Sequence, residues 1–553
     1  DNFPNSLADS YVYRMAEDAQ GNLWIGCKNG LSVFNPHTKR FRNYFHQSNN
    51  PRSLSNNWVT SVLKDNHNRM WLGTRGGGLN LYNESSDDFQ IFQHKADNPN
   101  SLAHNDLLCL QEDEKNNIWI GTENGGLSVL NLQSFNFTTY TFDANDPNSL
   151  SNNSVYSIYR DDIGNIWVGT WSGGVNFLPK FGRKFKSYKN NIGSNSLNNN
   201  FVLSITGDGK DQIWIGTDGG GINYFNRKTQ TFDFIKNNPS NPNSPRTDYV
   251  IAVDYLNPST LALGYHRGGF GLYNILTKTF ENYSIDTPDP KSRISSWSVN
   301  SVVRDHQQNF WIGTWNGGLN FMNAQTHEVT TFKHEPNKAN SIPNNNINIV
   351  FIDRDGRTWI GTETGAARYL PHSKSFARYI HQVSDPQSIS NDYITCFADG
   401  PKGYLWVGTS GGLNLLNIKT GKFKRYSETD GFANNAIKSI VIDKKGNLWI
   451  SSNKGLTRFN YYKNDVRNYS LADGLQSNEF KARASFMTQD GEIYFGGLNG
   501  FNSFYPDSIK DNTFVPPVYI TNLSIFNTPI TTGFSNPNFP THINSAKKIV
   551  LNY

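Results

Sequence analysis

The sequence predicts an all-β fold of tandem β-propellers, and three observations carry this prediction. A stretch made of a polar turn, a short strand, a glycine turn and a second strand recurs along the 553-residue chain, and residues 161–177 show it in full. Successive tryptophans of this stretch, from Trp24 to Trp214, are 47 or 48 residues apart. Aromatic residues make up 14 % of the chain and glycines number 47, a composition that suits short strands joined by tight turns.

Each repeat is expected to form four antiparallel strands, and the copy at residues 148–188 illustrates them in order. A polar turn leads to a first strand at 155–159, and residues 166–168 are consecutively apolar, which indicates a second strand covered on both faces. Gly173 and Gly174 allow the tight turn to a third strand, and residues 185–188 form the fourth. Because one such sheet cannot bury both faces alone, a repeat of about 47 residues indicates a propeller blade.

The chain contains eleven copies of this stretch. Two weaker copies carry Leu261 and Tyr494 in place of the tryptophan. The other nine carry Trp24, Trp71, Trp119, Trp167, Trp214, Trp311, Trp359, Trp406 and Trp449. Because a common propeller has four to eight blades, eleven copies predict two rings.

The boundary between the two rings is expected near residue 192. The fourth copy lacks the Asn-x-x-Thr turn that other repeats carry, for example at residues 226–229. Seven copies follow this point, so residues 193–514 are expected to form a complete seven-bladed propeller. Residues 1–192 hold four copies, the C-terminal four blades of a first propeller, and three further blades are expected upstream of Asp1.

The repeat pattern stops near Val515, which indicates a third domain. Residues 516–526 alternate between apolar and polar side chains, and the chain ends within another apolar strand at residues 549–553. Residues 515–553 are therefore expected to begin an immunoglobulin-like β-sandwich.

Composition argues against several classes of protein. The net charge of +5 is small for this length, so no nucleic-acid partner is expected, and no apolar run is long enough to span a membrane. Cys27, Cys109 and Cys396 are an odd number and are expected to be buried free thiols. The acidic turn at residues 353–356 lacks the further ligands of a calcium loop, so neither a metal nor a cofactor is expected.

The repeats resemble a known family. They follow the pattern Asp-x-x-Gly-Asn-x-Trp-Ile-Gly-Thr-x-x-Gly-Gly, and the most specific residues are those of the last copy, at 473–480 and 495–501. In these residues the chain is similar to the sensor region of hybrid two-component regulators from Bacteroides-type bacteria. In that family the last blade leads into a small three-tyrosine β-domain, which residues 516–553 resemble.

The resemblance covers the whole chain and implies a function in signal transduction. It implies a periplasmic sensor region of an inner-membrane protein, without a catalytic domain of its own, anchored by a later transmembrane helix. A histidine kinase and a response regulator would follow that helix. Oligosaccharides released from glycans would be the ligands, and polysaccharide-utilisation genes the target of transcription regulation. The full-length protein would be a homodimer through its C-terminal β-domain.

Candidate ligand-binding residues lie in two sets of loops that share one face of a propeller. The tryptophans of the second strands are expected to be structural, since nearly every repeat has one. Trp171 and Trp315 instead follow a second strand, and Trp297 stands at the start of a first strand. An exposed aromatic ring in such a loop can cover the apolar face of a sugar.

The weak repeat around Leu261 adds three candidates, Tyr249, His266 and Arg267. His266 and Arg267 replace the small or acidic residues of other repeats, which is explained either by decay of the repeat or by its recruitment for binding. Arg267 would favour a carboxylate or sulfate, and so an acidic oligosaccharide, and a surface salt bridge is the alternative role for it.

Two functions remain open from the sequence, besides a purely structural scaffold. One is a sensor that binds its ligand on the rim of the second ring. The alternative is a propeller-fold glycan lyase or hydrolase, which needs a convergent acid and base. The available groups are Glu123, Asp218, His266 and Glu363, but they are scattered over different repeats.

Overall fold

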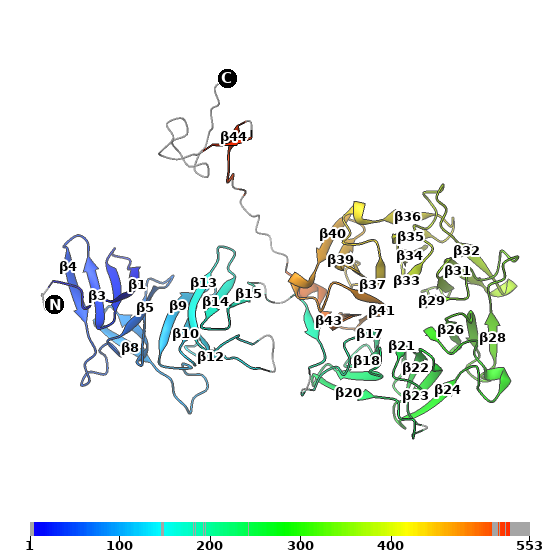
Figure 1. Cartoon of the computed structure of the whole chain (residues 1–553), viewed down its shortest axis with the longest axis horizontal. Coiled ribbons are helices and arrows are strands. Elements are labelled where there is room, and N and C mark those ends of the chain that lie inside the picture. The colour runs from blue at the N-terminus through cyan, green and yellow to red at the C-terminus, as the bar shows by residue number, and fades with distance from the viewer. Residues whose placement is uncertain are drawn as a thin grey trace.

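The computed structural model consists of β-strands in small antiparallel sheets, and among the described residues its helical elements are short 3-10 turns. It describes residues 5–144, 149–180, 182, 184–191, 193, 195–241, 243–510, 518, 520–525 and 527–530. Figure 1 shows the sheets in two groups, an open N-terminal array and a closed ring. The 3-10 turns are η1 (Pro290–Ser292), η2 (Pro371–Ser373), η3 (Glu428–Asp430), η4 (Leu471–Asp473) and η5 (Pro506–Ser508).

The N-terminal array contains four sheets in chain order. Its first three sheets have four strands each, and its fourth has three. The strands are β1 (Val12–Glu17), β2 (Leu23–Cys27), β3 (Gly30–Asn35) and β4 (Arg40–Tyr44); β5 (Val59–Lys64), β6 (Met70–Thr74), β7 (Gly78–Asn83) and β8 (Asp88–Phe92); β9 (Leu107–Glu112), β10 (Asn117–Thr122), β11 (Leu127–Asn131) and β12 (Phe137–Tyr140); and β13 (Val155–Arg160), β14 (Ile166–Thr170) and β15 (Val175–Leu178).

The ring contains seven four-stranded sheets, which we number blades 1 to 7. Blades 1 to 3 are β17 (Val202–Gly207), β18 (Gln212–Thr217), β19 (Ile222–Asn226) and β20 (Thr231–Ile235); β21 (Val250–Asn257), β22 (Thr260–Tyr265), β23 (Gly269–Asn274) and β24 (Thr279–Tyr283); and β25 (Val299–Arg304), β26 (Phe310–Thr314), β27 (Leu319–Met322) and β28 (Val329–Phe332).

The remaining blades repeat this arrangement. Blades 4 to 6 are β29 (Ile347–Ile352), β30 (Thr358–Thr362), β31 (Gly365–Leu370) and β32 (Ser375–Tyr379); β33 (Ile394–Asp399), β34 (Tyr404–Thr409), β35 (Gly412–Asn417) and β36 (Phe423–Tyr426); and β37 (Ile437–Ile442), β38 (Leu448–Ser452), β39 (Gly455–Asn460) and β40 (Asp465–Tyr469). Blade 7 is β41 (Phe480–Met487), β42 (Ile493–Gly497), β43 (Gly500–Phe504) and β16 (Lys186–Tyr188).

Blade 7 corrects the predicted boundary near residue 192. Strand β16, expected to complete the fourth blade of the first array, pairs instead with β43, so that a strand from before residue 192 belongs to the ring. The physical reason is the open edge of β43. Pairing with β16 satisfies its backbone groups, and Phe185 is buried there beside Trp449 and Phe504.

The repeated tryptophan is structural in the sheets that carry it, as the sequence predicts. Its indole N–H donates to the aspartate of the preceding turn in all four sheets of the N-terminal array and in blades 3, 4 and 6 of the ring, for example from Trp359 to Asp353 over 2.8 Å. Arg357 also donates to Asp353, over 2.7 Å, so the carboxylate of the turn that resembles a calcium loop is engaged by the blade itself. The cysteines Cys27, Cys109 and Cys396 are free and buried.

The two ends of the N-terminal array expose apolar side chains. Trp167 is 40 % exposed, whereas the other eight repeat tryptophans are at most 8 % exposed, because each of those is covered by the next blade. Met15 and Tyr11 are exposed at the opposite end, on and before β1. Closure of this array by further blades remains a prediction.

The expected β-sandwich at residues 515–553 lies mostly outside the described residues. Within it the structure describes one short antiparallel pair, β44 (Ser524–Ile525) with β45 (Thr528–Pro529). In the described part of the chain, no helix has the length and apolar character that a membrane crossing requires.

Candidate functional site

Two loops of each blade meet on one face of the ring. We call the residue directly before the first strand the mouth residue. In blades 1, 2, 3, 5 and 7 it accepts a backbone hydrogen bond from the residue after the second strand. In blade 2 this bond joins His266 to Tyr249 over 3.0 Å, and in blade 1 Asp218 to Phe201 over 3.0 Å. The side chains of both loops therefore stand on one face, which we call the rim. The rim includes Phe201, Tyr249, His266, Arg267, Trp297, Trp315 and Tyr393.

Blades 2 and 3 bring three polar or aromatic groups together on the rim. The ring centroids of Tyr249 and His266 are 6.3 Å apart, with the planes nearly perpendicular at 80°. His266 Nδ1 lies 3.3 Å from the hydroxyl of Ser298, the mouth residue of blade 3. Tyr249 is 48 % exposed, so its ring is available to a ligand.

Arg267 has a defined backbone and an exposed side chain. Its φ of 56° lies in the left-handed region, and its backbone N–H donates to Ser298 Oγ over 3.2 Å. Within the described part of the chain its guanidinium takes part in no salt bridge, so the alternative of a surface ion pair is not observed. A ligand carboxylate or sulfate would find this group unpaired.

Trp315 and Trp297 differ in how they are held. Trp315 is 42 % exposed and its backbone N–H donates to the carbonyl of Ser298, which identifies Ser298 as the mouth residue. The repeat pattern predicts Trp297 at the mouth position, but in the structure Trp297 lies one residue before it. It is half-buried, and the guanidinium of Arg246 lies 5.3 Å from its ring centroid. Trp297 therefore packs between blades 2 and 3, while Trp315 presents its ring on the rim.

Trp171 stands apart from the other five candidates. It lies after β14 in the N-terminal array, is 70 % exposed and packs against Tyr156, with ring centroids 5.1 Å apart. The structure thus gathers Tyr249, His266, Arg267, Trp297 and Trp315 on neighbouring blades of the ring and leaves Trp171 on the other array.

Two rim aromatics were missed in the sequence. Phe201 and Tyr393 are the mouth residues of blades 1 and 5, and they are 44 % and 41 % exposed. Their position directly before a first strand is the one Tyr249 occupies, and an alignment of the repeats on that position would have found them. Aromatic mouth residues thus stand in three of the seven blades, namely 1, 2 and 5.

The weak blade 2 is repacked in a coordinated way. In blade 1, Thr217 donates to a carbonyl of the glycine turn over 3.0 Å, and Asn223 donates to Asn198 over 2.9 Å. Blade 2 has Tyr265 and Gly271 at these positions. A Cβ atom on Gly271 would lie 2.9 Å from the Tyr265 ring, so this ring fills the space that an asparagine takes elsewhere. Burial raises the pKa of Tyr265. Tyr265 and Gly271 thus replace the threonine and asparagine of blade 1 as a packed pair.

The carboxylates that could serve in catalysis are dispersed in the structure. Glu123 lies on the N-terminal array, where Arg75 donates to it over 3.3 Å. Glu363 accepts from Asn346 over 2.7 Å in blade 4, and Asp218 is exposed on blade 1. No hydrogen bond joins any two of Glu123, Asp218, His266 and Glu363 in the described residues, and these residues form no cluster of three metal-ligating side chains.

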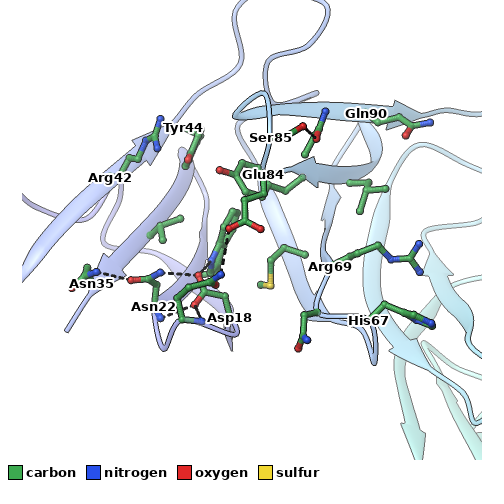
Figure 2. A pocket seen from close by; sticks show the side chains of 18 of the residues that line it. Asp18, Asn22, Asn35, Arg42, Tyr44, His67, Arg69, Glu84, Ser85 and Gln90 are labelled. Atoms are coloured by element: carbon green, nitrogen blue, oxygen red, sulfur yellow. Dashed lines mark hydrogen bonds between the residues drawn. The ribbon is translucent and has the colours of Figure 1, made fainter. Parts of the chain in front are cut away.

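A cavity of about 1240 Å³ lies between the first two blades of the N-terminal array. Figure 2 shows Asp18 and Asn22 on one side of it and His67 and Arg69 on the other. Asp18 accepts from Trp24 and Asn22 over 2.8 and 2.9 Å, and Arg69 is paired with Asp65 over 2.7 Å. Because these polar groups serve the turns of their own blades, the rim of the ring is the stronger candidate for ligand binding.

The fold and the rim define a β-propeller repeat protein with exposed aromatic residues on one face of its ring. Eight of its repeats match one family, the Two component regulator propeller. These eight segments of the chain are therefore similar to the repeats of two-component regulator propellers. The matched residues are 6–29, 53–76, 101–124, 149–172, 196–219, 341–364, 388–411 and 431–454.

One curated protein and one solved structure illustrate what this chain is similar to. It is 27 % identical to Histidine kinase P4 of Formosa agariphila over 287 residues, which are 51 % of this chain and 21 % of that protein. The chain thus spans about a fifth of the length of this relative. A solved structure, the extracellular domain of a protein designated hybrid two component system BT3049 from B. thetaiotaomicron, has a TM-score of 0.60 at 23 % identity. The match covers 95 % of this chain and 86 % of the solved chain, which supports the propeller fold.

Proposed function

We propose that this chain is the ligand-sensing region of a two-component sensor histidine kinase and that an oligosaccharide binds on the rim of the ring. The repeat family and the kinase name of the curated relative support the first part. The kinase and the response regulator belong to parts of the protein beyond this chain. The sensing region would lie in the periplasm, attached to the inner membrane, and would control genes for polysaccharide utilisation.

One observation carries the proposal of a rim site, the arrangement of blades 2 and 3. Tyr249 and Trp315 expose large parts of their rings, His266 contacts Ser298 between the two blades, and Arg267 has no ion pair in the described chain. Aromatic rings cover the apolar faces of sugars, while histidine and arginine donate hydrogen bonds to hydroxyl or acidic groups. Recruitment of a repacked blade fits the same function.

The proposed mechanism uses two arrangements of the propellers against the domain that follows. A ligand shifts such an equilibrium only when it binds one arrangement better than the other. A coupling free energy of about 1–3 kcal/mol would change ligand affinity roughly 5–150-fold. The full-length protein would be a homodimer through its C-terminal β-domain, with the propellers as levers on it.

Calorimetry with a panel of neutral and acidic oligosaccharides tests the proposal. Saturable binding without turnover supports the sensor. Cleavage of a glycan would support the alternative, a propeller lyase or hydrolase, and neither binding nor turnover would leave a scaffold. A longer chain that continues through the β-domain should dimerise and bind with a different affinity. Equal affinities would contradict the lever mechanism.

A further inference from the structure

Arg483 occupies an unusual backbone position in blade 7. It lies in the middle of β41, where the register with β42 slips: five steps along β41, from Phe480 to Ser485, match two along β42, from Gly497 to Phe495. The φ of Arg483 is 67°, in the left-handed region that a non-glycine residue seldom adopts. Phe480 and Ala484 are fully buried on either side and hold this bulge in place. Bulges and left-handed residues concentrate at binding sites, where they re-aim a side chain.

The bulge directs Arg483 across the centre of the ring. Its guanidinium donates to the backbone carbonyl of Asn348, the second residue of β29 in blade 4. Blade 4 is three blades from blade 7 in one direction around the ring and four in the other, and Figure 1 shows β29 and β41 on different sides of the ring's centre. Asn348 follows the mouth residue Asn346 by two positions, so Arg483 lies close below the rim.

Among the described residues, no carboxylate forms a salt bridge with Arg483. Its Nε atom is buried without a hydrogen-bond partner in that part of the chain. Burial lowers the pKa of Arg483 to about 10, an effect that the Tyr393 hydroxyl partly offsets. The group remains charged at neutral pH, and a withdrawn cation is normally compensated by an anion.

The surroundings add further positive charge. Lys438 is the second residue of β37 in blade 6, and Lys481 is on β41; Glu479 is a carboxylate that interacts with Lys438. Lys438 also interacts with Lys481, so these two cations share one neighbouring carboxylate. Tyr393, the aromatic mouth residue of blade 5, stands close enough to influence Arg483 and is 41 % exposed.

We propose that Arg483 is the centre of an anion-binding site at the middle of the ring, and that it receives a carboxylate or sulfate group of the saccharide that the rim binds. The inference rests on the proposed ligand-binding function of the rim and adds the chemical class of the ligand. A planar guanidinium matches either anion through paired N–H donors. The simpler alternative is a strut, in which Arg483 only ties blade 7 to blade 4.

Small anions test the site without an oligosaccharide. Sodium glucuronate and sodium sulfate, with glucose as the neutral control, are titrated at constant ionic strength while the melting temperature and the heat of binding are recorded. Arg483→Asn removes the charge, and asparagine tolerates a positive φ. Arg483→Lys keeps the positive charge but removes the paired N–H donors of the guanidinium. Lys278→Asn is the matched control, since it removes an exposed cation from another positive-φ position, in the turn between β23 and β24.

The wild-type chain should bind at least one anion saturably and glucose not at all, and the tighter anion identifies the ligand group as carboxylate or sulfate. Arg483→Asn should weaken this binding about tenfold or more, Arg483→Lys less, and Lys278→Asn not measurably. Two results would overturn the proposal in favour of the strut. One is equal anion binding by wild type and Arg483→Asn. The other is a lower melting temperature of Arg483→Asn together with no anion binding by wild type. If the chain binds neutral oligosaccharides but neither anion, the proposed ligand-binding function stands and the anion site at Arg483 is refuted.

Discussion

The rings of Tyr188 and Phe501 stack with their centroids 4.7 Å apart and their planes 14° from parallel, although 313 positions separate the two residues in the chain. Tyr188 belongs to β16, which enters from the N-terminal array, and Phe501 to β43 of the last blade. The ring is therefore closed by the segment that connects it to the array. The segment that joins the N-terminal array to the ring is therefore itself a strand of blade 7.

Tyr188→Ala should lower the free energy of unfolding of the ring by about 2 kcal/mol, less than for a fully buried aromatic residue because Tyr188 is half-buried. Urea unfolding followed by tryptophan fluorescence measures this. Tyr462→Ala, at a position that is 77 % exposed, is the control and should change little. Equal stability of both variants would show that β16 does not hold the ring closed.

A salt bridge between Arg227 of blade 1 and Asp490 of blade 7 also closes the ring. It predicts that the stability of the ring depends on pH. Partial burial opposes ionisation of Asp490, but hydrogen bonds from Arg227, Thr488 and Tyr505 outweigh it and hold the pKa of Asp490 well below its usual range. A lowered pKa in the folded state gives stability that is present above the unfolded pKa of about 4 and is lost as pH falls below it. Asp490→Asn should reduce the difference in urea midpoint between pH 7 and pH 3. Asp162→Asn, an exposed control, should leave the difference unchanged.

The repeat tryptophan and the rim tryptophan should respond in opposite ways. Trp359 is fully buried and donates to Asp353, so Trp359→Ala should lower the free energy of unfolding by about 3–5 kcal/mol. Trp315→Ala should leave the melting temperature nearly unchanged, because that ring is 42 % exposed. Differential scanning calorimetry of the two variants decides this, and similar losses would refute a rim position for Trp315.

The rim variants should lose ligand and keep stability. His266→Ala, Arg267→Ala and Trp315→Ala should each weaken oligosaccharide binding about five- to tenfold, which corresponds to one lost hydrogen bond or stacking contact. Titration calorimetry with the best ligand of the panel measures this. Tyr462→Ala again serves as the unaffected control. Binding equal to wild type in all three variants would mean that the ligand sits elsewhere.

The repacked blade 2 can be tested by a double-mutant cycle. Gly271→Asn alone should destabilise the ring, because its Cβ would meet the Tyr265 ring at 2.9 Å. Tyr265→Thr alone should also destabilise it, because it leaves a cavity beside Gly271. The double variant restores the residues that blade 1 carries as Thr217 and Asn223, so its loss in unfolding free energy should be smaller than the sum by about 1–3 kcal/mol. Additive losses would show that the two replacements are independent.

Local sequence is sufficient to specify the blades and the role of their tryptophans. The 47- to 48-residue period, the apolar second strand and the glycine turn act over short distances, so each copy specifies its own sheet wherever it stands. The same local logic placed Tyr249, His266, Arg267 and Trp315 on one rim, since their loops are joined within each blade or to the next.

The pairing of β16 with β43, and not with β15, follows from tertiary packing alone. The residues of β16 look like any outer strand, and their local sequence does not reveal that β43 offers a better edge than β15, because that choice depends on closing a ring across more than 300 residues. Packing likewise determines that Trp297 is held between blades while Trp315 is free, and that a bulge aims Arg483 at Asn348. Such long-range relationships arise from contacts between blades, which a repeat pattern does not encode.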